Sequence, residues 1–348
     1  MSVRILVGDC REMLRTLPDE SVHCCVTSPP YFGLRSYLPE GHPEKHLEIG
    51  LEATPDRYVT EMVAVFREVR RVLRPDGTLW LNIGDSYASS TKGSGGHNPK
   101  QDRNVGSWMS DRRWRIADGL KPKDLIGIPW LLAFALRADG WWLRSEIIWH
   151  KVAPMPESVR DRPTRAHEQV FLLSKGPTYF YDRKAARDPL RDTSVARLSQ
   201  PAYDEQRGSD RANGGAKTNG TMRAVAAHFS GRNKSQINDQ TRLASGNEWS
   251  QAPEDGANWR DVWSFASEGF TGPHFAVMPS ILAERCIRAG SPPGGVVLDP
   301  FLGSGTTALV ADRLGRDAIG IDLEPGSAAM ARRRIEADAG LFAEVAAQ

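Results

Sequence analysis

The sequence predicts an α/β fold, in which a mostly parallel sheet of seven strands carries helices on both faces. Short β-rich runs alternate with segments of helical periodicity along most of the 348 residues, which is typical of a doubly wound sheet. A glycine-rich turn near the C-terminus joins a short apolar strand to a helix. Only one expected strand follows that turn, so the N-terminal half must supply the remaining strands, as in a circularly permuted fold.

The N-terminal half accounts for five of the expected strands and for three helices. The strands are expected at residues 3–7, 22–27, 78–83, 143–149 and 169–173. The helices are expected at residues 10–17, 55–73 and 124–138. The second helix has the clearest start, because Thr54 is a favourable N-cap and Pro55 suits the first helical position. Its apolar side chains recur at helical spacing up to the turn at Pro75.

The C-terminal part accounts for the other two strands, at residues 296–298 and 318–321, and for helices at residues 306–314 and 325–339. In a permuted sheet, the strand at 3–7 lies beside the strand at 318–321. The strand at 22–27 lies on the other side of the strand at 296–298. The tips of these strands then meet at one edge of the sheet, where such folds bind their ligands.

Two regions lack this alternation, at residues 86–123 and 183–270. Residues 183–243 contain 12 Lys and Arg against 6 Asp and Glu, a local excess of positive charge. An irregular stretch of this length is usually functional or disordered. Judged by charge alone, the segment could equally be a solvated insertion or a contact surface for nucleic acid.

The composition is that of an ordinary globular protein, with 40% hydrophobic and 25% charged residues and a net charge of +2. The four cysteines form neither a zinc-binding spacing nor a disulfide framework, which indicates a reducing compartment. No signal-peptide pattern occurs, and no apolar run approaches the length that crosses a membrane. We expect a cytoplasmic protein with no membrane partner.

The glycine-rich turn has the features of a nucleoside-cofactor site. The strand at 296–298 runs into Asp299, and Gly-Ser-Gly at 303–305 precedes a helix. The next strand ends at Asp322, whose carboxylate can accept hydrogen bonds from ribose hydroxyls. Asp9, at the tip of the first strand, can reach the same pocket and accept from an adenine amino group. The alternative is a structural turn with Asp322 on the surface.

Several motifs occur in one permuted order: VGDCREML at 7–14, TSPPY at 27–31, HFAVMP at 274–279, LDPFLGSGTT at 298–307 and IGIDLEP at 319–325. Together with RRVLRPDGTLWLNIGDSY and IIWHK…HEQVFLLSK, they resemble motifs of the S-adenosylmethionine-dependent DNA amino-methyltransferases, which act on cytosine N4 or adenine N6. The order is that of the permuted β-type group, in which the catalytic motif precedes the cofactor motif. The resemblance covers residues 1–85, 120–182 and 262–340. Asp322 departs from the pattern, since Glu is more common there.

The resemblance implies a circularly permuted Rossmann-like methyltransferase fold, with S-adenosyl-L-methionine as the cofactor. It implies cofactor contacts from Asp9, Cys10, Thr27, His274, Phe275, Met278, Asp299, Pro300, Phe301, Gly303, Ser304, Gly305, Thr306, Asp322 and Leu323. The eight histidines show no metal-ligand spacing, and we expect no metal. In the family, a variable insert between the two halves reads the DNA target. We therefore expect a catalytic half at 1–182, a target-recognition region at 183–262 and a cofactor-binding half at 263–348.

The catalytic motif is expected to act on an exocyclic amine, through Ser28, Pro29, Pro30 and Tyr31. Such an amine is a poor nucleophile because its lone pair is delocalised into the ring. The Ser28 hydroxyl and the Pro29 carbonyl can accept its N–H groups, and the prolines add no competing donors. Tyr31 offers a flat face to a base rotated out of the duplex. The methyl group then passes directly to nitrogen, without a covalent enzyme intermediate.

Family members with Ser at the first motif position mostly methylate cytosine N4, so Ser28 favours that base over adenine N6. Methylation of cytosine C5 is disfavoured, because no cysteine follows a proline. Two more remote alternatives are methylation of RNA or of a protein glutamine, and a DNA-binding protein that has lost catalysis. Double-stranded DNA is the expected partner, so the protein would be associated with the nucleoid. A cognate restriction endonuclease and the formation of a homodimer are both possible.

Overall fold

The computed structural model describes residues 2–34, 36–39, 41–88, 119–189, 256–268, 277–339 and 344–347. The chain divides into two compact units, one formed by residues 1–182 and 260–348 and the other by residues 183–259. In the second unit the described residues include two short strands, β6 (Arg187–Asp188) and β7 (Ala257–Asn258), which pair antiparallel. The sheet and the candidate site belong to the first unit.

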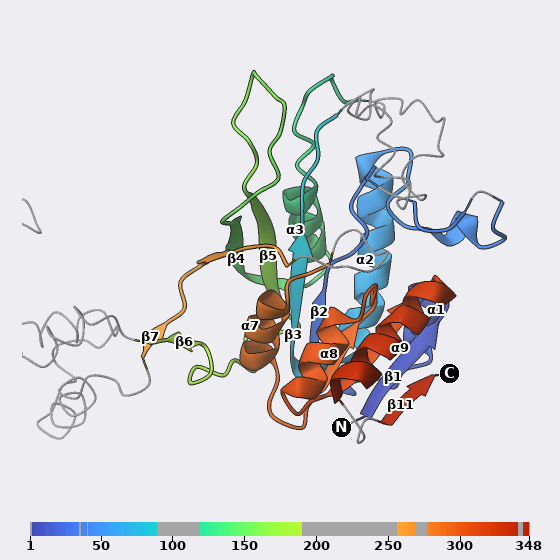
Figure 1. Ribbon diagram of the computed structural model, residues 1–348, viewed down its shortest axis with the longest axis vertical. Helices are drawn as coiled ribbons and strands as arrows, with labels where there is room; N and C mark the ends of the chain where they lie inside the picture. The colour runs from blue at the N-terminus through green and yellow to red at the C-terminus, as the bar shows by residue number, and fades with distance from the viewer. Residues whose placement is uncertain are drawn as a thin grey trace, which may run out of the picture. The chain divides into compact units, whose positions relative to one another are not determined.

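The first unit is built on a nine-stranded sheet in the order β11-β1-β10-β9-β2-β3-β5-β4-β8 (Figure 1). Its strands are β1 (Ser2–Val7), β2 (Val22–Thr27), β3 (Leu73–Ile83), β4 (Trp142–Lys151), β5 (His167–Ser174), β8 (Val262–Phe265), β9 (Val296–Asp299), β10 (Asp317–Asp322) and β11 (Glu344–Ala347). Strand β5 pairs antiparallel with both β3 and β4, whereas the other pairings in this sheet are parallel. The mostly parallel α/β fold is thus confirmed.

The permuted strand order is also confirmed. Strand β1 lies beside β10 with Val7 opposite Asp322, and β2 lies beside β9 with Cys25 opposite Leu298. The N-terminal and C-terminal segments therefore share one sheet, and their strand tips lie at one edge. The sheet has two strands more than the seven expected. Both additional strands, β8 and β11, are four-residue strands at its outer edges, too short to show a clear pattern in the sequence.

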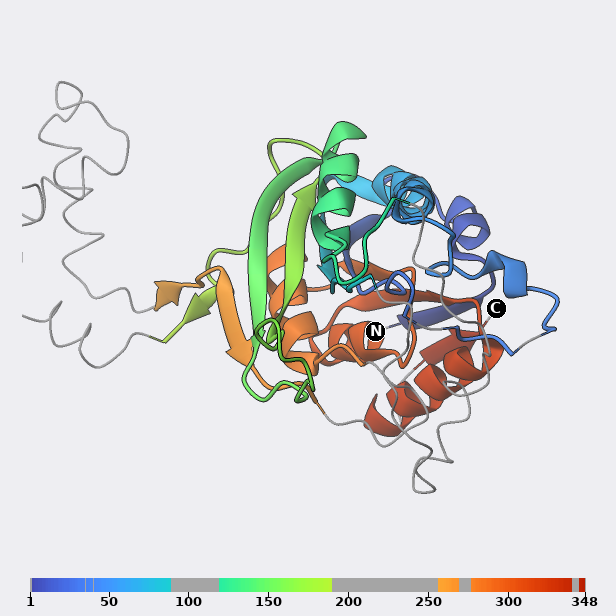
Figure 2. The same ribbon diagram turned by 90° about the horizontal axis from the view of Figure 1, so that it is seen from above.

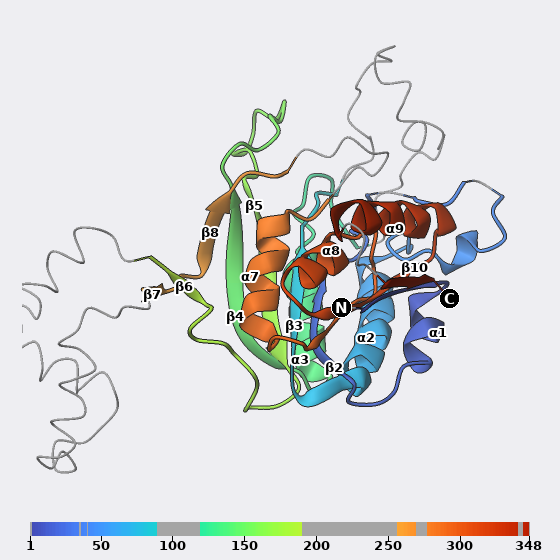
Figure 3. The same ribbon diagram turned by 60° about the horizontal axis from the view of Figure 1, so that its bottom comes forward.

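Helices cover both faces of the sheet (Figures 2 and 3). One face carries α1 (Cys10–Arg15), α2 (Pro55–Val72) and α3 (Ile128–Ala138), and the other carries α7 (Ser280–Gly290), α8 (Thr306–Arg313) and α9 (Pro325–Ala339). Helix α2 begins as expected, with the Thr54 hydroxyl accepting a hydrogen bond from the Arg57 N–H. Its buried face packs Tyr58, Met62 and Phe66 into the core between helix and sheet.

Helix α3 begins at Ile128, four residues later than the expected start at residue 124. The cause is local: Gly127 adopts a positive φ of 83°, and the Asp85 carboxylate accepts hydrogen bonds from the N–H groups of Gly127 and Ile128. Asp85 thus caps the helix from another segment of the chain. Helix α7 was not expected, although its buried face, including Leu282 and Cys286, has helical spacing. No helix among the described residues has the length and apolar character needed to cross a membrane.

Candidate active site

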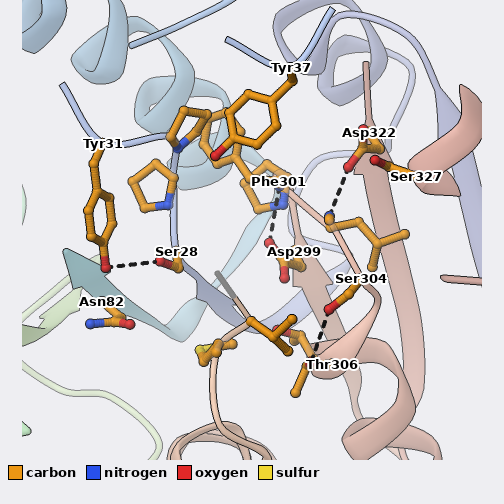
Figure 4. A pocket seen from close by; sticks show the side chains of 18 of the residues that line it. Ser28, Tyr31, Tyr37, Asn82, Asp299, Phe301, Ser304, Thr306, Asp322 and Ser327 are labelled. Carbon is orange, nitrogen blue, oxygen red and sulfur yellow. Dashed lines mark hydrogen bonds between the residues drawn. The ribbon is translucent and has the colours of Figure 1, made fainter. Parts of the chain in front are cut away.

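A cavity of about 500 Å³ opens at the edge of the sheet where the parallel strands end. Residues from the N-terminal half, among them Ser28 and Tyr31, line one side, and residues of the C-terminal half, among them Ser304 and Asp322, line the other (Figure 4). The permuted sheet therefore brings the two expected half-sites into one cavity. Of the expected site residues, the cavity is lined by Asp9, Cys10, Ser28, Pro29, Pro30, Tyr31, Met278, Asp299, Pro300, Phe301, Gly303, Ser304, Thr306, Asp322 and Leu323.

The glycine loop enters helix α8 by a tight turn. Gly303 and Gly305 have φ of 51° and 80°, values that favour glycine. A Cβ at Gly305 would lie only 2.8 Å from the Cβ of Ala331 in α9, so the turn leaves no room for a side chain. The guanidinium of Arg334 donates to the carbonyl of Ser304 and to the hydroxyl of Thr306, which fixes the loop from outside.

Two carboxylates stand beside this loop, Asp299 buried and Asp322 partly buried. Burial raises the pKa of Asp322 to about 7, although its oxygens accept hydrogen bonds from the N–H groups of Gly303 at 2.8 Å and Glu324 at 2.9 Å. Burial likewise raises the pKa of Asp299 to about 6, although hydrogen bonds from the Thr27 hydroxyl and the Phe301 N–H lower that pKa. Each oxygen of Asp322 accepts one of these hydrogen bonds and has a lone pair for another, so the carboxylate suits the hydroxyl groups of a ribose. These hydrogen-bond acceptors therefore fit a nucleoside cofactor.

Asp9 lies in the cavity wall, but its carboxylate already has close partners. One oxygen accepts from the Arg11 N–H at 2.8 Å and the other from the Arg11 guanidinium at 2.6 Å. Arg11 also pairs with Glu61. The contact between Asp9 and an adenine amino group therefore stays a prediction. Cys10 follows at the start of α1, where burial raises the pKa of its thiol to about 12, so the thiol stays protonated.

Ser28, Pro29 and Pro30 follow the end of β2 and face the cavity. The carbonyl of Pro30 accepts a hydrogen bond from the Tyr58 hydroxyl at 2.9 Å, so this carbonyl is already engaged. The neighbouring Pro29 carbonyl stays the predicted acceptor for an amine. The ring of Tyr31 packs against buried Gly84, where a Cβ would come within 2.6 Å of a ring carbon.

The structure adds a group of side chains that the sequence did not single out as site residues. Glu168 accepts a hydrogen bond from the Tyr31 hydroxyl at 2.6 Å and another from the Asn82 amide at 3.1 Å, and it pairs with Lys151. Trp149 is only 4% exposed and also lines the cavity. Glu168 carries no local sequence signal, because only the antiparallel pairing of β5 brings its first residues to the edge where the parallel strands end.

Some expected site residues are placed differently. Thr27 and Gly305 do not line the cavity but hold its walls, Thr27 through its bond to Asp299 and Gly305 by starting α8. His274 and Phe275 lie outside the described residues. Within the described part of the chain, no group of three His, Cys, Asp or Glu side chains could hold a metal ion.

Sequence comparison identifies relatives along the whole chain. A sequence model of the N6/N4 family described as DNA methylase matches residues 22–333. The type II methyltransferase M.SmaI of Serratia marcescens is 42% identical over 334 residues, which cover 96% of this chain and 91% of that protein. The type II methyltransferase M.Cfr9I of Citrobacter freundii is 39% identical over 331 residues, which cover 95% of this chain and 87% of that protein.

Solved structures with the same fold include one with the expected cofactor. The putative DNA modification methylase TTHA0409 of Thermus thermophilus, complexed with S-adenosyl-L-methionine, matches with a TM-score of 0.54 and 26% identity over 98% of this chain and 97% of that one. The cytosine-N4-specific PvuII DNA methyltransferase matches in fold, with a TM-score of 0.56 at 18% identity over 96% and 86% of the two chains. The Gly303–Gly305 loop and the Asp322 carboxylate of this chain fit such a cofactor. The chain belongs to the N6/N4 DNA methylase family.

Proposed function

We propose that the protein methylates the exocyclic N4 amine of a cytosine that has been rotated out of duplex DNA. The observation that carries this proposal is the position of Ser28, whose neutral hydroxyl stands at the tip of β2 in the same cavity as the glycine loop. In this first motif residue the chain resembles the family members that act on cytosine N4, most of which have Ser there. S-adenosylmethionine, when bound, supplies an electrophilic methyl group.

The chain's own residues orient the amine and exclude water. The Ser28 hydroxyl and the Pro29 carbonyl accept hydrogen bonds from its two N–H groups, which favours a tetrahedral nitrogen whose lone pair is no longer delocalised into the ring. The side chains of Tyr31 and Trp149 border the place where the base would lie, and both are largely removed from solvent. Positioning of this kind supplies most of the rate enhancement when no covalent intermediate forms.

The remaining parts of the proposal concern DNA recognition. In the sequence, residues 183–262 come between the two halves of the methyltransferase fold, and the excess of Lys and Arg within 183–243 suits contact with phosphates. We assign the reading of the target sequence to them. Because relatives such as M.SmaI are named type II methyltransferases, a restriction endonuclease with the same target is a proposed companion of this protein. Dimerisation stays a prediction.

The test is to incubate the purified protein and S-adenosylmethionine labelled in its methyl group with duplex DNA of mixed sequence. Mass analysis of the nucleosides is expected to show labelled N4-methylcytosine. Labelled N6-methyladenine would show that adenine N6 is the target instead. Label found only in RNA or protein would refute methylation of either base in DNA. Ser28→Ala is expected to abolish most of the transfer, whereas Ser21→Ala, on a turn away from the lining residues of the cavity, is the matched control.

A further inference from the structure

A chain of hydrogen bonds leads from the proposed amine site to a carboxylate on the far side of Tyr31. The Ser28 hydroxyl donates to the Tyr31 oxygen at 3.4 Å (Figure 4). The Tyr31 hydroxyl in turn donates to Glu168 at 2.6 Å. The same oxygen of Glu168 accepts from the Asn82 amide at 3.1 Å, and its other oxygen pairs with the Lys151 ammonium. The reactive centre is thus connected to a negative charge, although its first motif residue is neutral.

The chemistry of these partners determines the direction of every hydrogen bond. Lys151 and the amide nitrogen of Asn82 can only donate, so Glu168 is held as an acceptor and Tyr31 must donate to it. Burial, with the adjacent Glu168 carboxylate as the next cause, raises the pKa of Tyr31 well above its usual value. The Tyr31 hydroxyl therefore keeps its proton, and its oxygen is left to accept from Ser28. A Ser28 hydroxyl that donates to Tyr31 presents only lone pairs to the cavity.

We propose that Glu168 is a positioning residue, which through Tyr31 holds Ser28 in its acceptor state and then receives the proton that the amine loses. This inference rests on the proposed function, in which an exocyclic amine binds at Ser28. Hydrogen bonds in a chain polarise one another, so the charge on Glu168 makes the Ser28 oxygen a stronger acceptor than an isolated serine. Glu168 thereby supplies some of the negative charge that an Asp at the first motif position would provide.

The proton transfers balance without another reactant. The amine nitrogen would form one bond to the methyl carbon while the bond from that carbon to the sulfonium sulfur breaks and leaves its electron pair on sulfur. The nitrogen then carries a positive charge and must release one N–H proton. That proton passes to the Ser28 oxygen, the Ser28 proton passes to the Tyr31 oxygen, and the Tyr31 proton passes to Glu168. The amine and Glu168 end neutral, while Ser28 and Tyr31 regain their starting forms. The Glu168 side chain is 13% exposed, so it can return the proton to water after the product leaves.

Two variants each remove one link while preserving the shape of the site. Tyr31→Phe keeps the ring for stacking but removes the hydroxyl, and Glu168→Gln keeps the size of the side chain but removes its charge. Each is expected to reduce the single-turnover rate of methyl transfer roughly 100-fold. The dissociation constants for S-adenosylmethionine and for target DNA should stay within about twofold of wild type. An emissive cytosine analogue at the target position reports rotation of the base, and its fluorescence change should also stay within about twofold of wild type.

The double variant gives a result that a merely structural role would not produce. If both residues act through one chain, Tyr31→Phe combined with Glu168→Gln should be no slower than the slower single variant. Glu20→Gln, in an exposed ion pair with Lys175, is the matched control and should transfer methyl groups at the wild-type rate. Thermal unfolding of each variant shows whether it is folded.

The proposal is overturned if either single variant keeps a rate within about twofold of wild type, or if the two losses multiply in the double variant. Wild-type product analysis separates this result from failure of the proposed function. If the wild type methylates adenine N6, the assignment to cytosine is wrong, but the same variants still test the hydrogen-bond chain on that amine. If the wild type transfers no methyl group to DNA, both proposals fail.

Discussion

The Thr27 hydroxyl donates a hydrogen bond of 2.6 Å to the carboxylate of Asp299, although the two residues lie 272 positions apart in the chain. Thr27 ends β2, directly before the catalytic motif, and Asp299 ends β9, directly before the glycine loop. Both residues are buried. This hydrogen bond therefore joins the strand that presents Ser28 to the strand that presents the cofactor loop.

Thr27→Val is expected to weaken the site by removing the donor while keeping the shape of the side chain. A buried acceptor that loses its partner costs about 1–3 kcal/mol of folding free energy. Urea denaturation should show this loss, and calorimetry should show weaker binding of S-adenosylmethionine, because the pKa of Asp299 would rise further. Thr27→Ser keeps the hydroxyl and should retain most of the affinity. Equal affinities in the two variants would show that the bond does not support the cofactor loop.

The parts of the site that could be predicted from the sequence are those set by local backbone. Gly305 starts a helix and Asp322 ends a strand, in a pattern that a few neighbouring residues define, and Ser28 stands in a motif of its own. Glu168 could not be found in this way, because its position depends on the antiparallel pairing of β5, in which Glu168 lies opposite Trp149. A pairing between distant strands leaves no local pattern.

The same distinction holds for the fold. The permuted order followed from where the glycine-rich turn falls in the chain, and Val7 does lie opposite Asp322. The start of α3 was misplaced because its cap, Asp85, comes from the end of another strand rather than from the preceding residues. Sequence patterns thus predicted contacts within one element better than contacts between elements.

Binding of S-adenosylmethionine is expected to depend on pH through Asp322. Its pKa is about 7, and the ionised carboxylate is the form that best accepts hydrogen bonds from ribose hydroxyls. The affinity should therefore rise roughly tenfold between pH 6 and pH 8, as the group loses its proton, and then level off. Asp299, with a pKa of about 6, adds to the fall at lower pH.

The matched variant is Asp322→Asn, which cannot ionise. It should bind S-adenosylmethionine at least about tenfold more weakly at pH 8, since a charge-assisted hydrogen bond is lost. Its affinity should also lack the dependence on pH near 7. Calorimetry at several pH values measures both effects. An unchanged pH dependence in Asp322→Asn would assign the titration to another group.

Gly305→Ala is expected to disturb the cofactor loop by sterics rather than by charge. Its φ of 80° strains any side chain, and the new Cβ would lie 2.8 Å from the Cβ of Ala331. The strain and the overlap together should cost about 2–4 kcal/mol of folding free energy and weaken cofactor binding.

Gly294→Ala separates these two causes. Gly294 also has a positive φ, of 71°, but a Cβ at this position would meet no atom within 4 Å, so only the strain of about 1 kcal/mol should remain. Urea denaturation of both variants gives the comparison. If both lose the same free energy, contact with α9 does not constrain the loop.

Gly84→Ala is expected to impair methyl transfer without affecting the cofactor. A Cβ at Gly84 would approach a ring carbon of Tyr31 to 2.6 Å, and the ring cannot move away freely because its hydroxyl is bound to Glu168. Since a small misplacement of a positioning group lowers the rate strongly, transfer should slow by roughly tenfold or more. The dissociation constant for S-adenosylmethionine should change by less than about twofold, because Gly84 lies away from the glycine loop.

Gly176→Ala is the matched control, because a Cβ there would meet only the carbonyl oxygen of Thr178, at 3.9 Å. Single-turnover transfer and calorimetry of the two variants distinguish the position of the Tyr31 ring from a general loss of stability. Transfer by Gly84→Ala at the rate of Gly176→Ala would mean that the ring has room to shift, and that its place beside Gly84 does not limit the reaction.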